Sequence, residues 1–225
     1  MEWPRPPDSR RHEVSSKSEP DRPQQLELQP SSRRIEGFSD GVFAVAVTII
    51  VLEVRVPDSL AFANDAVAFQ QFATLLAIYV LTFVVVGILW ANHHYLVSTL
   101  SSGNRATLWL NNHVLFWVTM VPIVARFFGL HPTSPRATAA YAFVVMMCTG
   151  SLTLLRRHAS RMSANELHRA LHRRVFRRVW IAIGSYAAAI PLAFVNVRLS
   201  WALLIILPAL FFLPVVRAES EPSGR

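Results

Sequence analysis

The 225-residue sequence is poor in charged residues, in cysteine and in lysine. Charged residues make up 16% of the chain and hydrophobic residues 52%, whereas soluble domains carry roughly 25% charged residues. This composition argues against an ordinary soluble enzyme and against disorder over most of the chain. The single cysteine, Cys148, excludes an internal disulfide and a multi-cysteine metal site. Phosphate-loop, hydrolase and zinc-protease motifs are also missing, so we expect no catalytic residue, no metal and no cofactor.

Long apolar segments dominate the chain from residue 33 onward. Each is 18 to 20 residues long, and a helix needs about 20 residues to cross a hydrocarbon core of about 30 Å. Barrel strands are shorter and alternate in polarity, so we predict an all-α membrane protein with six transmembrane helices. The predicted spans are residues 35–52, 72–91, 107–125, 137–155, 179–197 and 199–216. Only Arg198 separates the last two runs, which leaves a tight hairpin and a re-entrant loop both open.

Two tails flank the predicted six-helix domain, which we assign to residues 33–216. Residues 1–32 contain six prolines and no periodic apolar pattern, which predicts a disordered N-terminal tail. Residues 217–225 form a short C-terminal tail.

Basic residues are distributed unevenly between the two sides of the predicted membrane domain. Residues 156–178 contain eight arginines, and a cytoplasmic N-terminus places 18 of the 22 basic residues on the cytoplasmic side. The positive-inside rule therefore predicts that both termini are cytoplasmic. The arginine-rich segment determines topology in this interpretation, and we expect no nucleic-acid partner. Within it, Ser163 and Glu166 match a capping box, which predicts a short cytoplasmic helix leading into the fifth span.

Ionisable side chains inside a membrane span are costly and mark candidate functional positions. Glu36 and Asp40 are four residues apart and share one face of the first helix, where like charges repel. Arg33 is near enough along the helix to serve Glu36, whereas Asp40 lies deeper and needs a partner from another helix. Alternatively, both carboxylates lie at the membrane surface, at the solvated start of the helix.

The second span ends with candidate partners for Asp40. In the predicted topology the first span begins on the side where the second ends, so Asp40 lies level with Trp90 and His93. Asn111, at the start of the third span, lies at the same depth. These groups predict an interhelical polar network. His93 and His94 point about 100° apart on a helix and cannot easily ligate one metal ion together.

The first span also carries a recognisable motif. Its residues are Arg34-x-x-x-Phe38-Ser39-Asp40, followed by an apolar run to Leu52. This pattern resembles the first-helix motif of the transmembrane protein 175 family of potassium channels. The resemblance extends over residues 33–215 through Trp90-x-x-His93, Asn111 and Val121-Pro122.

The resemblance implies a potassium-selective homotetramer in the plasma membrane, with the first helix of each subunit lining a central pore. Ions would pass hydrophobic side-chain constrictions, and the T-V-G-Y-G motif of carbonyl filters is missing from the sequence. Matched residue by residue, the constrictions fall on Val45, Ile49 and Leu52, and a selectivity layer falls on Thr48. The family's narrowest ring is usually leucine or isoleucine, and the smaller Val45 departs from this pattern.

The resemblance also implies an interhelical network that supports the pore helix and assembly without touching ions. Its matched residues are Arg34, Phe38, Ser39, Asp40, Trp90, His93 and Asn111.

Helical spacing is compatible with the implied pore. Val45, Ile49 and Leu52 fall within about 60° on one helix face, with Thr48 beside them. By itself such a stripe is also typical of a lipid-facing or core surface.

A proton-coupled or proton-conducting transporter is the alternative function, with Asp40, His93 and His94 as a relay. For a membrane enzyme or scaffold the sequence nominates no residues. The expected partners are potassium ions, the lipid bilayer and further copies of the chain.

Overall fold

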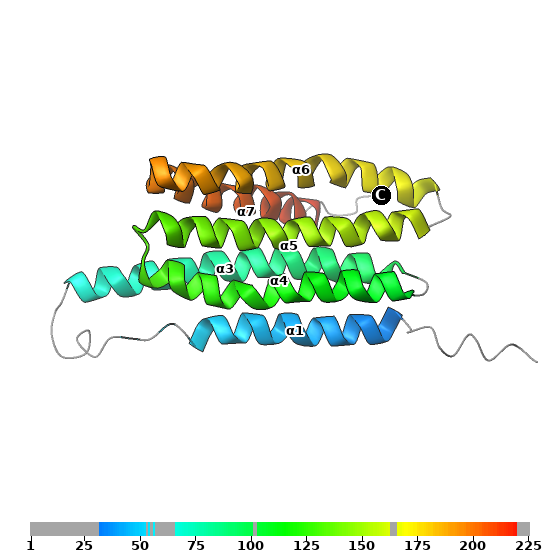
Figure 1. Cartoon of the computed structure of the whole chain (residues 1–225), viewed down its shortest axis with the longest axis horizontal. Helices are drawn as coiled ribbons and strands as arrows, with labels where there is room; N and C mark the ends of the chain where they lie inside the picture. Colours follow the sequence, from blue (N-terminus) through cyan, green and yellow to red (C-terminus); the bar gives the residue numbers. More distant parts are fainter. Residues whose placement is uncertain are drawn as a thin grey trace, which may run out of the picture.

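The described chain is a bundle of six α-helices in a computed structural model, which describes residues 32–52, 54, 56, 66–100, 103–162 and 166–219. The helices are α1 (Ser32–Leu52), α3 (Ala66–Ser98), α4 (Arg105–Leu130), α5 (Pro135–Met162), α6 (Glu166–Val195) and α7 (Val197–Glu219). They lie side by side along one long axis (Figure 1). The predicted tails lie almost entirely outside the described residues, and their boundaries stay predictions.

All six predicted spans lie on helices, which confirms the all-α fold class. The predicted boundary between the last two spans at Arg198 is wrong, because α6 ends at Val195 and Arg198 already belongs to α7. Among the described residues, α1, α3, α4, α5 and the Arg178–Val195 part of α6 are long and apolar enough to cross a membrane. The apolar part of α7 with described side chains, Val197–Pro208, is shorter than a span. The chain is therefore a multi-pass helical membrane protein, with five candidate spans in its described part.

The helices extend beyond the predicted apolar runs. α3 contains 33 residues, and at 1.5 Å per residue it is about 50 Å long, more than a hydrocarbon core of about 30 Å. α6 is continuous from Glu166 to Val195, so the predicted helix before the fifth span and that span are one element. Ser163 of the predicted capping box lies outside the described residues.

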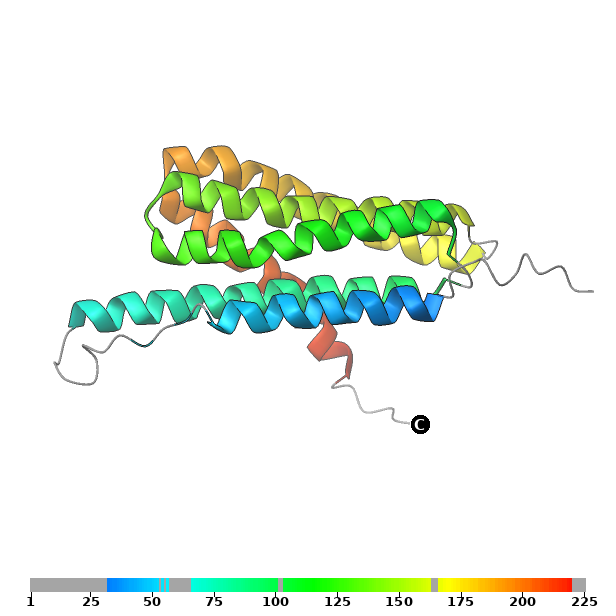
Figure 2. The same cartoon turned by 60° about the horizontal axis from the view of Figure 1, so that its bottom comes forward.

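Local sequence signals account for several helix ends. Asn104 caps α4, since its side-chain oxygen accepts a hydrogen bond from the Thr107 backbone N–H at 2.8 Å. Pro135 occupies the first position of α5, where a proline loses no helical hydrogen bond. Asn196 alone separates α6 from α7, and its side-chain oxygen accepts from the backbone N–H of Arg198 at 3.0 Å. The two helices pack against each other as a tight hairpin (Figure 2).

The packing is asymmetric around α1. Among the described helices, α5 packs against α3, α4, α6 and α7, whereas α1 contacts α3 and α4 alone. Figures 1 and 2 show α1 at the margin of the bundle, next to α4 in the first view and next to α3 in the second. Its buried residues recur every three or four positions along one face, as a helix with one packed side requires. These residues are Ile35, Ser39, Phe43, Ala46 and Ile50.

Candidate functional site

A chain of hydrogen bonds joins α1, α3 and α4 in the bundle interior. His93 Nε2 lies 2.7 Å from Asn111 Oδ1, and the Asn111 amide nitrogen donates to Ser39 Oγ at 3.0 Å. The Ser39 hydroxyl donates to the Ile35 carbonyl oxygen at 2.7 Å. His93, Asn111 and Ser39 are all buried. With the proton on His93 Nε2, these bonds run in one direction from His93 through Asn111 to Ser39, and they join three helices. His93 Nδ1 is buried and has no hydrogen-bond partner among the described residues.

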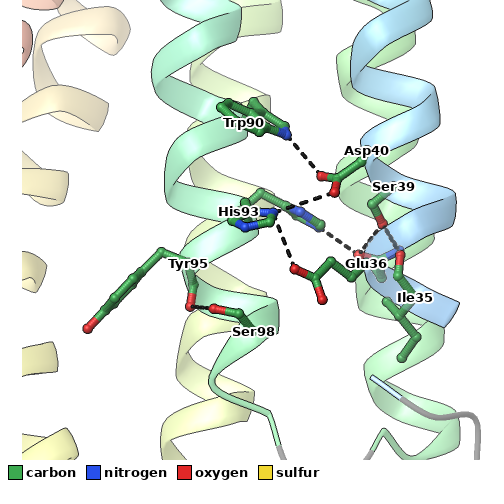
Figure 3. Close-up of polar contacts among 10 residues, drawn as sticks. Ile35, Glu36, Ser39, Asp40, Trp90, His93, Tyr95 and Ser98 are labelled. Carbon is green, nitrogen blue, oxygen red and sulfur yellow. Dashed lines mark hydrogen bonds and ion pairs between the residues drawn. The ribbon is translucent and has the colours of Figure 1, made fainter. Parts of the chain in front are cut away.

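Asp40 lies one position beyond Ser39 and faces α3. The Trp90 indole N–H donates to Asp40 Oδ1 at 2.9 Å, which is a well-formed bond to a charged acceptor. Figure 3 shows the Glu36 and Asp40 carboxylates directed from α1 toward α3. Asp40 thus has the partner from another helix that its depth requires.

His94, also on α3, faces both acidic residues of α1. Its Nδ1 lies 3.3 Å from Glu36 Oε1 and 3.5 Å from Asp40 Oδ2. Arg33, the expected partner of Glu36, is exposed and forms no ion pair with it among the described residues. We call this set of seven side chains the α1–α3 polar cluster. Its members are Glu36, Ser39, Asp40, Trp90, His93, His94 and Asn111.

Two residues of the first-helix motif lie apart from this cluster. Arg34 and Phe38 are exposed on the opposite side of α1. Within the described chain neither takes part in the hydrogen bonds of the cluster. The structure therefore brings together five of the seven predicted network residues and leaves these two on the uncovered face.

The predicted constriction residues also lie on that uncovered face. Val45 is 56% exposed, and Ile49 and Leu52 are exposed too. The Thr48 hydroxyl donates to the Val45 carbonyl oxygen at 3.0 Å within the helix. We call Val45, Thr48, Ile49 and Leu52 the exposed stripe of α1.

An open groove runs beside the exposed stripe, between α1 and α4. Its volume is about 530 Å³, and its lining is almost entirely apolar. Val45 and Ile49 border it from α1, and Thr119 and Pro122 border it from α4. The surface next to the exposed stripe is therefore concave and apolar.

Two buried polar contacts elsewhere were not expected from the sequence. The hydroxyls of Thr82 and Tyr141 lie 3.2 Å apart and join α3 to α5. Arg156, counted among the topology-determining arginines, is only 5% exposed and donates to Asn92 Oδ1 at 3.3 Å. Residue type alone gives no signal for either contact, because both depend on how α5 is rotated against α3.

Known proteins are similar to this chain both in sequence and in the arrangement of their helices. A family model described as "Endosomal/lysosomal potassium channel TMEM175" matches residues 34–122. A potassium channel of Chryseobacterium sp. (strain P1-3) is 30% identical over 190 residues, which cover 84% of this chain and 96% of the relative. The crystal structure of a lysosomal potassium-selective channel TMEM175 homolog from Chamaesiphon minutus has a TM-score of 0.70 and 26% identity, and the match covers 81% of this chain and 97% of that one.

An animal protein matches a shorter part of the chain. The endosomal/lysosomal proton channel TMEM175 of Danio rerio is 33% identical over 116 residues, which cover 48% of this chain and 22% of the relative.

The fold and these matches define a multi-pass α-helical membrane protein of an ion-channel class. The chain belongs to the TMEM175 family. This is a family of channels, so the chain is not an enzyme, as the sequence predicted.

Proposed function

We propose that the chain is a potassium-permeable channel of the cell membrane, assembled as a homotetramer around a pore lined by α1. The observation that carries this proposal is the exposed stripe of α1: an apolar helix face left uncovered on the element that holds the family's first-helix motif. The bacterial relative named as a potassium channel supports potassium as the permeant ion. Its alignment over most of both chains supports the same pore-forming fold in this chain.

Side chains, not backbone carbonyls, form the proposed constrictions. Val45, Ile49 and Leu52 contribute one apolar ring each when copies of α1 surround an axis, because closed cyclic symmetry repeats every residue. Such rings make ions shed water, and they empty of water when narrow. Potassium gives up its hydration shell more readily than sodium, so narrow apolar rings favour potassium. Thr48 supplies a hydroxyl layer between the rings.

The α1–α3 polar cluster has a supporting role in this proposal. Ser39, His93 and Asn111 are buried, so they hold α1 from behind while the exposed stripe faces the axis. Asp40 and Trp90 add a charged hydrogen bond at the same level. Arg34 and Phe38 lie on the same side as the stripe, which suits contacts with a neighbouring subunit.

Charge distribution supports cytoplasmic termini for the proposed channel. With the start of α1 in the cytoplasm, the arginines at the end of α5 and the start of α6 are cytoplasmic as well, as the positive-inside rule requires. The α1–α3 polar cluster then lies toward the cytoplasmic end of the pore. This topology has α7 crossing as the sixth span.

Ion flux in liposomes tests the proposal directly. The purified full-length chain should carry potassium into vesicles, and bilayer currents should reverse near the potassium equilibrium potential in a potassium/sodium gradient. Empty vesicles serve as the control. Flux no higher than in those vesicles would refute the channel. The tetramer is tested by crosslinking in mild detergent, where a ladder that stops at dimers would contradict it.

Proton conduction is the second candidate, because the zebrafish relative is named a proton channel. Asp40, His93 and His94, all in the α1–α3 polar cluster, would be the relay groups of such a path. A relay predicts that His93→Gln abolishes proton flux in a well-assembled protein, whereas the potassium pore predicts that conductance survives. A pH-sensitive dye inside the vesicles separates the two.

A further inference from the structure

The Glu36, Asp40 and His94 side chains form a compact group of three potential metal ligands. One atom from each of them lies within 4.8 Å of the other two. His94 Nδ1 is buried at the atom level, has no hydrogen-bond partner, and faces the two carboxylates. We propose that these three residues bind a divalent transition-metal ion of the Zn²⁺ class, which joins α1 to α3.

The distances fit ligation better than direct hydrogen bonding. Nδ1 lies 3.3 Å from Glu36 Oε1 and 3.5 Å from Asp40 Oδ2, beyond the range of about 2.7–3.2 Å for a good N–H···O bond. Zinc binds nitrogen and oxygen at about 2.0–2.2 Å, so neighbouring tetrahedral ligands lie about 3.3–3.5 Å apart. The two nitrogen–oxygen separations match this tetrahedral edge.

The surroundings of the group orient its ligands. The Trp90 N–H holds Asp40 Oδ1 at 2.9 Å and leaves Oδ2 directed to His94. The Trp90 ring also packs against the His94 ring, with centroids 5.5 Å apart. Hydrogen-bonded carboxylates and fixed imidazole rings are the usual support of metal ligands.

The chemistry of the three ligands selects the class of ion. Two carboxylates and a neutral imidazole carry two negative charges, which balance a divalent cation. Imidazole suits zinc, nickel and cobalt, whereas calcium takes six to eight oxygen ligands and magnesium an octahedron of oxygens. His93 is not a member of this group of three ligands, and its Nε2 is bonded to Asn111.

The position of the group allows an ion to reach it from water. Glu36 is four residues from the start of α1, and at 1.5 Å per residue this is about 6 Å along the helix. The side chains of Glu36, Asp40 and His94 are 24%, 35% and 44% exposed. A water molecule can therefore complete the coordination shell, and binding does not depend on whether the chain conducts potassium.

Cobalt spectroscopy tests the site, because Co²⁺ takes the same ligands as Zn²⁺ and absorbs visible light strongly when tetrahedral. The full-length chain, purified with a histidine-free tag, should bind one Co²⁺ per chain with a visible spectrum that Zn²⁺ abolishes. His94→Gln should remove this spectrum, and Glu36→Gln should weaken Co²⁺ binding at least tenfold. His131→Gln is the control, because His131 is an exposed histidine just after the C-terminal end of α4, and it should leave the Co²⁺ spectrum intact.

Thermal unfolding provides a second measurement. Zn²⁺ should raise the unfolding midpoint of the parent and of His131→Gln, and leave that of His94→Gln unchanged. If His94→Gln aggregates, Glu36→Gln is tested in the same two ways. Absence of a tetrahedral Co²⁺ spectrum in the parent would overturn the proposal. So would spectra of Glu36→Gln and His94→Gln that are as strong as that of the parent, because they would assign the ion to other groups.

Discussion

One face of α1 packs against other helices of the same chain, and the opposite face does not, among the described residues. The buried face meets α3 and α4 through Ser39, Phe43 and Ile50, and it ends in the α1–α3 polar cluster. The opposite face presents Val45 and Ile49 to an open groove, without a covering helix among the described residues. One face is therefore covered by helices of the same chain, and the other is open to contact with lipid or with another subunit.

This difference shows what sets the rotation of a membrane helix about its axis. Lipid tails are as apolar as leucine, so apolar side chains alone give little preference for one orientation in a bilayer. Hydrogen bonds between buried polar groups do give such a preference, because an unpaired polar group is costly there. The buried bonds of Ser39, His93 and Asn111 therefore determine which residues the other face of α1 presents.

The largest expected effect follows from replacing Asn111 by leucine. This change removes the partner of both His93 and Ser39 and should lower the free energy of unfolding by about 2 kcal/mol, since buried polar groups left unpaired cost about 1–3 kcal/mol. Asn112→Leu is the matched control, because Asn112 is adjacent and exposed. Thermal unfolding followed by tryptophan fluorescence should show a lower midpoint for Asn111→Leu alone. Equal midpoints would contradict a supporting role for the buried bonds.

Asp40→Ala should act next most strongly, through assembly. The change leaves the Trp90 N–H without its acceptor and His94 without one of its two carboxylates. Because this bond is exposed, its loss should cost about 1 kcal/mol, the net value of an ordinary hydrogen bond. Size-exclusion chromatography should show loss of the tetramer. A tetrameric but non-conducting Asp40→Ala protein would point to direct contact with ions instead.

Changes at Val45 should alter permeation without altering stability. Val45→Ala and Val45→Asn widen or wet the proposed ring, and should raise conductance and lower the preference for potassium. Val45→Leu narrows it and should sharpen that preference. Val51→Ala is the control and should leave permeation unchanged. Val51 is 45% exposed on the same helix, but it lies about 120° from Val45 around the helix axis. Reversal potentials unchanged in all three Val45 variants would mean that another surface lines the pore.

Thr48→Val should have the smallest effect. The Thr48 hydroxyl donates to a carbonyl of its own helix, so valine of nearly the same shape should leave folding and assembly intact. Loss of the hydroxyl layer should shift the potassium/sodium reversal potential by a few millivolts. A loss of assembly would place Thr48 in a subunit contact instead.

The fold was largely predictable because span length is a simple physical requirement. Apolar runs of 18 to 20 residues correspond to all six observed helices. Helix ends were less predictable, because polar residues beyond the hydrocarbon core continue a helix at little cost. For this reason α3 begins at Ala66 and ends at Ser98, well outside its predicted span.

The polar cluster was predictable in its depth but not in all its pairs. Charge asymmetry placed Asp40 and His93 on one side of the membrane, and they do lie together. The pairing of Glu36 with His94 instead of Arg33 depends on helix rotation, which hydropathy does not contain. Arg156 illustrates the same limit, since counting charges does not distinguish a buried arginine from a solvated one.

Pro122 lies inside α4 and lines the groove beside Val45. A proline inside a helix lacks the N–H that would bond to the carbonyl four residues earlier, so α4 has one hydrogen bond fewer at this level. The bending stiffness of α4 is therefore lowest where it borders Val45 and Ile49. A bend of α4 at this proline would change the width of the groove beside the proposed constriction.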